Sequence, residues 1–214
     1  MKKGCILCLL ISVISLPLIA QNIIYSNLKE LLAQHGDTTA VLRVEKRSRN
    51  QIVLTGGADY RITAGDDESM CRRLKKRCFA VRDEKGDLYL NCRKLRYKKL
   101  RFGAWYAPAV QLGKNIYFCA MPLGSVFGGN FVEEDDVKLG GNIGDALAAS
   151  SLVTKRVCYE LNGETGKVDF LGKDRMLQLL KNYPELKQAY LKDDSQEAKH
   201  TFKYLLELQN NQKK

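Results

Sequence analysis

The stretch Phe79–Asn91, with the sequence FAVRDEKGDLYLN, is the clearest indicator of fold in this chain of 214 residues. Residues that favour strands stand at both ends of it, and the polar segment 84–86 between them ends in glycine. A three-residue loop with glycine last is typical of a β-hairpin, because glycine adopts the left-handed conformation that such a turn needs. We therefore predict antiparallel strands over Phe79–Arg82 and Leu88–Asn91.

The register of this hairpin sets two cysteines opposite each other. If Asp83 faces Asp87, then Cys78 faces Cys92 at a position without ladder hydrogen bonds, where the side chains of an antiparallel pair lie closest. We hypothesise a disulfide between Cys78 and Cys92. Five cysteines follow residue 20, so at least one of them has no partner in the same chain. None has C-x-x-C spacing or a nearby histidine, so the sequence predicts neither a metal site nor a cofactor.

Further strands are predicted where β-favouring runs flank turn residues. These are two more hairpins, 105–111 with 116–120 and 155–161 with 167–171, and two single strands, 41–45 and 51–55. Since Pro108 has no backbone N–H, we expect it at a sheet edge or a bulge.

Helical patterns stand at the start and at the end of the chain. Ser26 precedes a short helix that ends before Gly36, and acidic residues precede a basic helix over 69–76. Apolar residues at helical spacing extend over 173–209, with Pro184 opening a new segment. Because strands come first and helices later, we predict the α+β class: an antiparallel sheet built from hairpins, with a short N-terminal helix and a C-terminal helical segment.

The first twenty residues have the three parts of a secretory signal peptide. Lys2 and Lys3 precede an apolar stretch from Ile6 to Ile19, and the small residue Ala20 follows it. We predict cleavage after Ala20, export to the periplasm or out of the cell, and a single domain over residues 21–214. No later apolar run approaches the roughly 20 residues that a membrane-spanning helix needs, so the mature chain is expected to have no transmembrane segment.

The formal net charge is +11, and one segment carries most of the surplus. Between Arg72 and Arg101 the chain has thirteen Lys and Arg residues and three acidic ones, and aromatic residues alternate with the later cations. Cations bind anionic groups while aromatic rings stack on sugars or bases. We therefore predict an outward-facing anion-binding site made of Arg93, Lys94, Arg96, Lys98, Lys99 and Arg101, with Trp105 and Tyr106 close by.

The expected partners follow from export and from this charge. Outside the cytoplasm the accessible polyanions are anionic glycans, lipid head groups and acidic proteins, and nucleic acid is not expected. The alternative is a solvated strand pair whose lysines discourage aggregation at a sheet edge.

Catalytic residues are scarce, because His35 and His200 are the only histidines and neither belongs to a recognisable motif. We therefore expect a non-catalytic protein, with two alternatives. One is an exported hydrolase in which the fold assembles a Cys-His pair with His35 or His200, for instance Cys119 or Cys158 with His200. The other is a structural subunit that docks proteins through the segment 124–144 or through the C-terminal helices.

The segment 124–144 is rich in glycine and is predicted to be a long loop. Its acidic run, Glu133–Asp136, lacks the alternating spacing of a calcium-binding loop. The order of Gly140, Gly141 and Gly144 differs from that of phosphate-binding loops. Neither feature predicts a ligand site.

Four features of the sequence stand out together: the signal ending in Ala20 and Gln21, the segment Leu88–Leu95 with the later pairs Phe102-Gly103 and Tyr106-Ala107, the segment 158–161 leading to 164–168, and the order of residues 176–186. In these features the chain resembles a family of uncharacterised secreted proteins of the Bacteroidetes. The resemblance covers most of the chain after residue 21. It implies a cell-envelope or secreted setting and carries no catalytic residues with it.

Overall fold

The structure is a computed structural model that describes residues 21–39, 41–55, 57–98, 100–121, 156–193 and 198–212. The predicted signal peptide and the glycine-rich loop 124–144 lie outside these ranges. Within them, no helix is both long enough and apolar enough to span a membrane.

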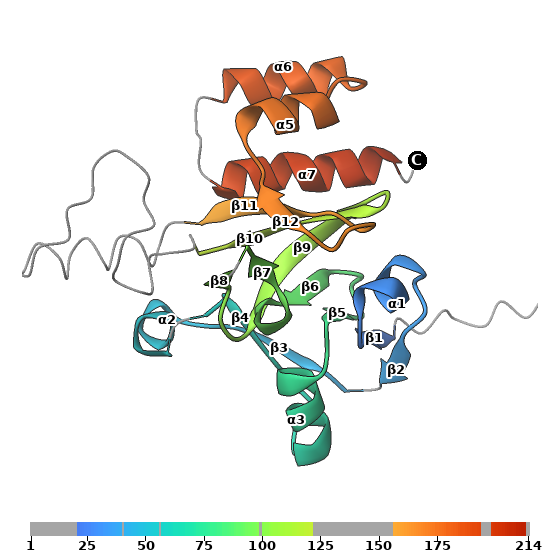
Figure 1. The fold of residues 1–214 in the computed structure, drawn as a ribbon, viewed down its shortest axis with the longest axis vertical. Helices are drawn as coiled ribbons and strands as arrows, with labels where there is room; N and C mark the ends of the chain where they lie inside the picture. Colours follow the sequence, from blue (N-terminus) through green and yellow to red (C-terminus); the bar gives the residue numbers. More distant parts are fainter. Residues whose placement is uncertain are drawn as a thin grey trace, which may run out of the picture.

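One antiparallel sheet of ten strands organises the molecule (Figure 1). Its main path has the order β12-β11-β10-β9-β6-β5-β1-β2, and β4 pairs with both β3 and β9. The strands are β1 (Asn22–Tyr25), β2 (Asp37–Thr39), β3 (Arg43–Lys46), β4 (Tyr60–Thr63), β5 (Ala80–Arg82), β6 (Leu88–Asn91), β9 (Tyr106–Leu112), β10 (Asn115–Ala120), β11 (Val157–Leu161) and β12 (Val168–Phe170). A separate two-stranded sheet consists of β7 (Arg96–Tyr97) and β8 (Leu100–Arg101).

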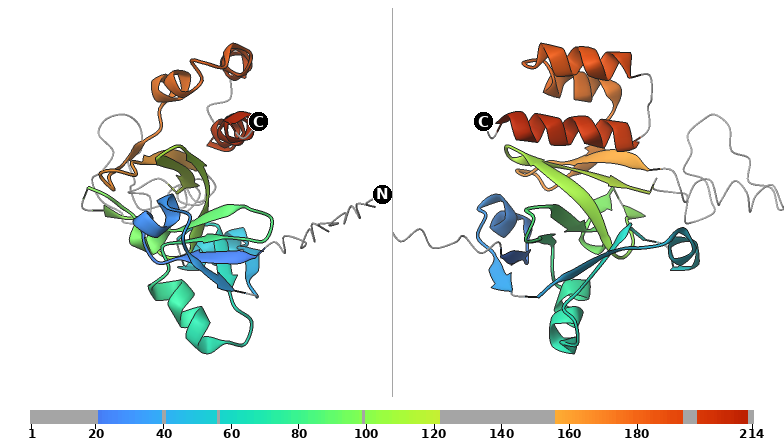
Figure 2. Two further views of the ribbon diagram at one scale, coloured as in Figure 1. Left: turned by 90° about the vertical axis from the view of Figure 1, so that its right-hand side faces the viewer. Right: turned by 180° about the vertical axis from the view of Figure 1, so that it is seen from behind.

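The helices lie around this sheet. They are α1 (Leu28–Leu32), α2 (Arg49–Thr55), α3 (Glu68–Lys76), the single 3-10 turn η1 (Cys92–Lys94), α5 (Lys173–Leu179), α6 (Pro184–Lys192) and α7 (Ala198–Gln212). The three C-terminal helices gather at one end of the molecule, and α3 lies at the opposite end (Figures 1 and 2). This arrangement confirms the α+β prediction.

The predicted hairpin over Phe79–Asn91 is confirmed together with its register. Ala80 pairs with Leu90 and Arg82 pairs with Leu88. The Asp83 N–H donates to the Asp87 carbonyl at 2.9 Å, and Gly86 has a φ of +85°. The two other predicted hairpins also form, as β9–β10 and β11–β12.

The prediction of a strand over 51–55 is wrong, because these residues belong to α2. The Ser48 N–H donates to Gln51 Oε1 at 2.8 Å, and the Gln51 N–H donates to Ser48 Oγ at 3.3 Å. This reciprocal pair is a capping box, which satisfies the free N–H groups at a helix start. The local capping hydrogen bonds therefore outweigh the β-propensity of the apolar residues that follow.

The central strand β9 contains Pro108, which we expected at an edge or a bulge. Pro108 instead lies opposite Tyr89 of β6, within the sheet. On the other edge of β9, the pairing with β10 ends at Ala109 and the contact with β4 occurs at Tyr106. Pro108 thus falls in the gap between two partner strands, where a missing N–H breaks no ladder hydrogen bond.

Buried side chains form three clusters around the sheet. The largest cluster contains Phe118 and Tyr159, a second lies between β9–β11 and the helices α5 and α7, and a third contains Leu74 of α3 and Ile62 of β4. Tyr106 OH and Asn91 Nδ2 both donate to the Leu74 carbonyl, at 2.8 and 3.1 Å. These two bonds hold the C-terminal end of α3 against the sheet.

Candidate functional site

The cations predicted to bind anions lie on one short segment between β6 and β9. Arg93 and Lys94 belong to η1, Arg96 to β7 and Arg101 to β8, while Lys98 occupies the turn between β7 and β8. All five side chains are exposed. Lys99 lies outside the described residues. We refer to residues 93–98 and 100–101 as the cationic segment.

Two buried residues anchor the later part of the cationic segment, Leu95 within it and Phe102 directly after it. Leu95 is 2% exposed and Phe102 is 8% exposed, and both belong to the largest core cluster. The Phe102 ring meets the Phe118 and Tyr159 rings edge-on, with centroids 5.4 and 4.8 Å apart. The backbone between these anchors therefore leaves the core and returns to it, which presents the cations to solvent.

The ladder of the cationic segment places like charges opposite each other. Arg96 and Arg101 are direct cross-strand partners, and such a pairing destabilises a sheet. Lys98 Nζ lies 5.3 Å from the centre of the Tyr97 ring. Among the described residues, no carboxylate forms an ion pair with any of the five cations. The repulsion between them is therefore not offset within this part of the chain.

One aromatic pair accompanies these cations. The Tyr97 and Phe170 rings have centroids 4.8 Å apart, and Phe170 on β12 is 49% exposed. Trp105 and Tyr106 follow these cations in sequence, but their side chains contact other parts of the molecule. Tyr106 is 2% exposed beneath α3, and the Trp105 ring lies against Arg47 and Arg61.

Most of the other cations between Arg72 and Arg101 lie away from the cationic segment. Arg72, Lys75, Lys76 and Arg77 are exposed on α3 or directly after it, and Arg73 forms an ion pair with Asp37. In Figure 1, α3 lies at the end of the molecule away from the C-terminal helices, whereas β7 and β8 lie near its middle. The surplus of positive charge is thus divided between two surfaces.

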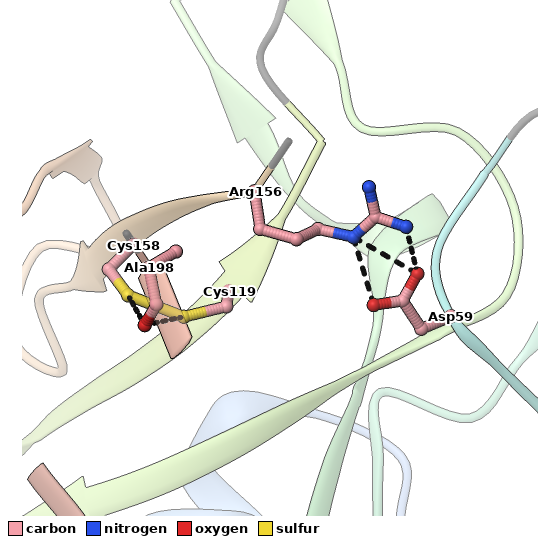
Figure 3. Close-up of a disulfide and its surroundings, with 5 residues drawn as sticks. All are labelled: Asp59, Cys119, Arg156, Cys158 and Ala198. Atoms are coloured by element: carbon pink, nitrogen blue, oxygen red, sulfur yellow. Dashed lines mark hydrogen bonds and ion pairs between the residues drawn. A yellow bond between two sulfur atoms is a disulfide. The ribbon is translucent and has the colours of Figure 1, made fainter. Parts of the chain in front are cut away.

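The hypothesis of a Cys78–Cys92 disulfide is wrong in this structure. Cys78, Cys92 and Cys71 are free thiols, and the disulfide joins Cys119 of β10 to Cys158 of β11. These two residues are direct partners in the β10–β11 ladder, with Cα atoms 4.3 Å apart. Figure 3 shows both sulfur atoms beside the Ala198 carbonyl of α7.

The thiols of Cys78 and Cys92 stay apart because the β5–β6 ladder ends before it reaches them. The chain enters η1 at Cys92, and Cys78 follows the last turn of α3. The two side chains consequently pack into different core clusters. Burial raises the pKa of Cys78 to about 11 and the pKa of Cys92 to about 12, so neither thiol is a ready nucleophile at neutral pH.

The disulfide also removes the two cysteines named as examples for the hydrolase alternative. Neither Cys119 nor Cys158 retains a thiol to pair with His200. His200 Nδ1 instead lies 2.8 Å from Asp193 Oδ2. The loop residues named for the docking alternative lie outside the described part of the chain. Within that part, no three His, Cys, Asp or Glu side chains gather as a metal site would require.

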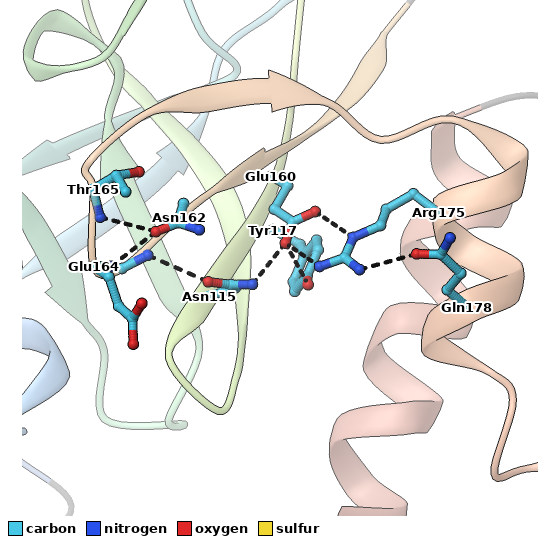
Figure 4. A network of polar contacts seen from close by, with 9 residues as sticks. Asn115, Tyr117, Glu160, Asn162, Glu164, Thr165, Arg175 and Gln178 are labelled. Atoms are coloured by element: carbon cyan, nitrogen blue, oxygen red, sulfur yellow. Dashed lines mark hydrogen bonds and ion pairs between the residues drawn. The ribbon is translucent and has the colours of Figure 1, made fainter.

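A polar network joins the sheet to the C-terminal helices (Figure 4). Glu160 of β11 accepts two hydrogen bonds from Arg175 of α5, both at 2.8 Å. It also accepts from Asn115 Nδ2 at 2.6 Å and from Tyr117 OH at 3.1 Å. The bonds from Arg175 hold the pKa of Glu160 below its ordinary value. Both carboxylate oxygens of Glu160 have hydrogen-bond partners within the protein, which indicates a structural role for this network.

An open pocket of about 340 Å³ lies where β3, β4 and α3 meet beside Trp105. Its wall includes Arg43, Arg61 and Lys75, none of which our sequence reasoning singled out. The three residues lie on elements that are separated in sequence, and the strand β4 was not predicted. The one available signal was the lone tryptophan, because tryptophan is enriched among the residues that contribute most to binding.

Comparison with known proteins identifies a family. The family model described as "Family of unknown function (DUF6563)" matches residues 23–212. Searches of curated proteins and of solved structures find no significant match. The origin in the Bacteroidetes and the secretion that the sequence resemblance implies stay predictions. Because the match covers the described sheet and all the C-terminal helices, the chain belongs to the family of unknown function DUF6563.

Proposed function

We propose that this protein is exported and non-catalytic, and that the cationic segment binds an anionic polymer or surface of the cell envelope. The observation that carries the proposal is the direct pairing of Arg96 with Arg101. Repulsion between opposed like charges costs stability unless an anion lies against them. Phosphate, sulfate or carboxylate groups at close spacing supply that anion, and arginine binds them through two parallel hydrogen bonds.

The aromatic pair beside the cations favours a glycan. Tyr97 and the half-exposed Phe170 form an apolar surface next to Lys98. Sugar rings have an apolar face that packs on aromatic rings, while their anionic substituents reach the cations. Anionic glycans therefore fit the cationic segment better than lipid head groups, which present charge without rings.

Two observations support export. Residues 1–20 have the charged, apolar and small-residue parts of a secretory signal peptide, and the family match begins at residue 23. The Cys119–Cys158 disulfide is a bond that forms and persists in oxidising compartments outside the cytoplasm.

Retention on heparin over a salt series tests the proposal. We expect the protein to bind at low salt and to elute as salt screens the charges. A variant with Arg96, Lys98 and Arg101 replaced by Ser should elute at clearly lower salt. The matched control replaces Arg72, Lys76 and Arg77 by Ser, which removes the same charge from the exposed surface in and next to α3.

This control distinguishes binding at a specific site from binding through the net charge of the protein. Equal shifts of the two triple variants would mean that only net charge matters, and no retention at low salt would mean that no polyanion site exists. Either result contradicts the proposal. Vesicles with anionic lipids form a second arm, and stronger retention on them than on heparin would replace the glycan with a lipid surface.

A further inference from the structure

The pocket beside Trp105 is lined by charges of both signs. Arg43 and Glu45 come from β3, Arg61 from β4, Lys75 from α3, and Asp66 from the turn before α3. Glu45 lies directly opposite Arg61 in the β3–β4 ladder. Within the described ranges, none of these five charged groups forms an ion pair with another. Their charges are therefore not neutralised by ion pairs with one another.

Trp105 forms one wall in a costly backbone conformation. Its φ is +76°, a region that bulky residues rarely adopt because it is sterically strained. The Trp105 carbonyl accepts from the Cys92 N–H at 2.9 Å, and the Ala104 carbonyl accepts from the Ala58 N–H at 2.9 Å. The surrounding structure thus compels this conformation.

Contacts with Gly57 and Arg47 fix the indole ring of Trp105 as well as its backbone. A Cβ on Gly57 would lie 2.4 Å from the Ala104 carbonyl oxygen and 2.8 Å from Trp105 Cδ1, so only glycine fits there. The guanidinium of Arg47, which is 7% exposed, lies 5.0 Å from the centre of the indole ring. Strain that is held in place from several sides is typical of a ligand contact.

We propose that this pocket binds a small anionic sugar, such as a sugar phosphate or a uronic acid. The Trp105 side chain gives the sugar ring an apolar contact at the pocket wall, beside the Arg61 guanidinium, which lies 5.8 Å from the centre of the indole ring. Arg43, Arg61 and Lys75 bind the anionic group through charge-assisted hydrogen bonds. Glu45 and Asp66 accept hydrogen bonds from sugar hydroxyls, a role that a site for a bare inorganic anion would not need. The site is distinct from the cationic segment, and the inference does not depend on it.

Trp105 supplies the measurement, because it is the only tryptophan of the chain. Titration with glucose 6-phosphate or glucuronate should change its fluorescence saturably. Lys75→Gln should weaken the binding of both ligands at least tenfold, while Lys76→Gln, one position further along α3 and not in the pocket, should bind as the unmodified protein does. Calorimetry provides a second readout that does not depend on the fluorophore.

The other outcomes of these measurements either support or overturn sugar binding in the pocket. Absence of fluorescence change and of heat with both ligands overturns the inference. Equal affinity for inorganic phosphate and glucose 6-phosphate also overturns it, since the sugar would then contribute nothing. The variant with Arg96, Lys98 and Arg101 replaced by Ser should keep full sugar affinity. Loss of affinity there would place the sugar on the cationic segment and not in the pocket.

Discussion

At the residue scale, Glu160 shows how one carboxylate stabilises a junction between elements. Its side chain is 12% exposed and accepts hydrogen bonds from Arg175, Asn115 and Tyr117. These bonds stabilise the ionised form, and Glu160 together with burial raises the pKa of Tyr117 to about 12. Both groups therefore keep one protonation state over the neutral range.

Glu160→Gln should lower the free energy of unfolding by about 1–2 kcal/mol at pH 7, because an amide cannot match two charge-assisted bonds to Arg175. The pKa of Glu160 is lower in the folded state than its ordinary value of 4.5. Its contribution is thus present above pH 4.5 and is lost as the pH falls below that value. Urea unfolding at several pH values should show a flatter acid limb for the variant.

The control for Glu160→Gln is Glu164→Gln. Glu164 forms an exposed ion pair with Lys114 at 2.8 Å, and exposed pairs contribute little. Its stability curve should overlay that of the unmodified protein. An equal loss in both variants would contradict the special role of the Glu160 network.

At the scale of elements, α3 depends on a side chain from the neighbouring strand. Asn91 Nδ2 donates to the Leu74 and Cys78 carbonyls at 3.1 and 2.9 Å, and its Oδ1 accepts from the Arg93 N–H. Asn91 is 1% exposed, so water does not replace these partners. One buried amide therefore links the end of α3 to the start of the cationic segment.

Asn91→Ala should lower the free energy of unfolding by about 1–3 kcal/mol, because it leaves buried backbone groups without partners. Hydrogen exchange should speed up at the Arg77 and Cys78 amides, which bond to the Arg73 carbonyl. The exposed Asn182 offers a comparison, and Asn182→Ala should change neither measurement. Unchanged exchange at the end of α3 would show that Tyr106 alone holds the helix.

The observed helices and strands differ in how well the local sequence predicts them. The β5–β6 hairpin was predictable to within one residue, since its turn chemistry and its alternation are local. The apolar residues of the segment 51–55 led to the prediction of a strand, although Ser48 and Gln51 are a capping-box signature that the sequence also offers. The strands β1, β2 and β4 escaped prediction, since their partners are distant and their short runs carry little pattern.

At the scale of the whole molecule, the Cys119–Cys158 disulfide joins two strands 39 residues apart in the chain. Cys119→Ala with Cys158→Ala should lower the free energy of unfolding by roughly 2–4 kcal/mol, because the unfolded chain gains conformational entropy when the cross-link is absent. Reductant should destabilise the unmodified protein and leave the double variant unchanged. Peptide mapping without reduction should find the Cys119–Cys158 link, and a Cys78–Cys92 link would contradict the structure.

The sequence by itself determined the α+β class, the hairpins and the C-terminal helices, because turn residues, caps and apolar periodicity act over a few positions. It also located the cations of residues 93–101 on one segment. Only the tertiary structure decided which cysteines pair, how the positive surplus divides between two surfaces, and that Trp105 meets Arg61 and Lys75 at a pocket. Those outcomes depend on contacts between residues far apart in the chain, and the energies of such contacts leave no local pattern.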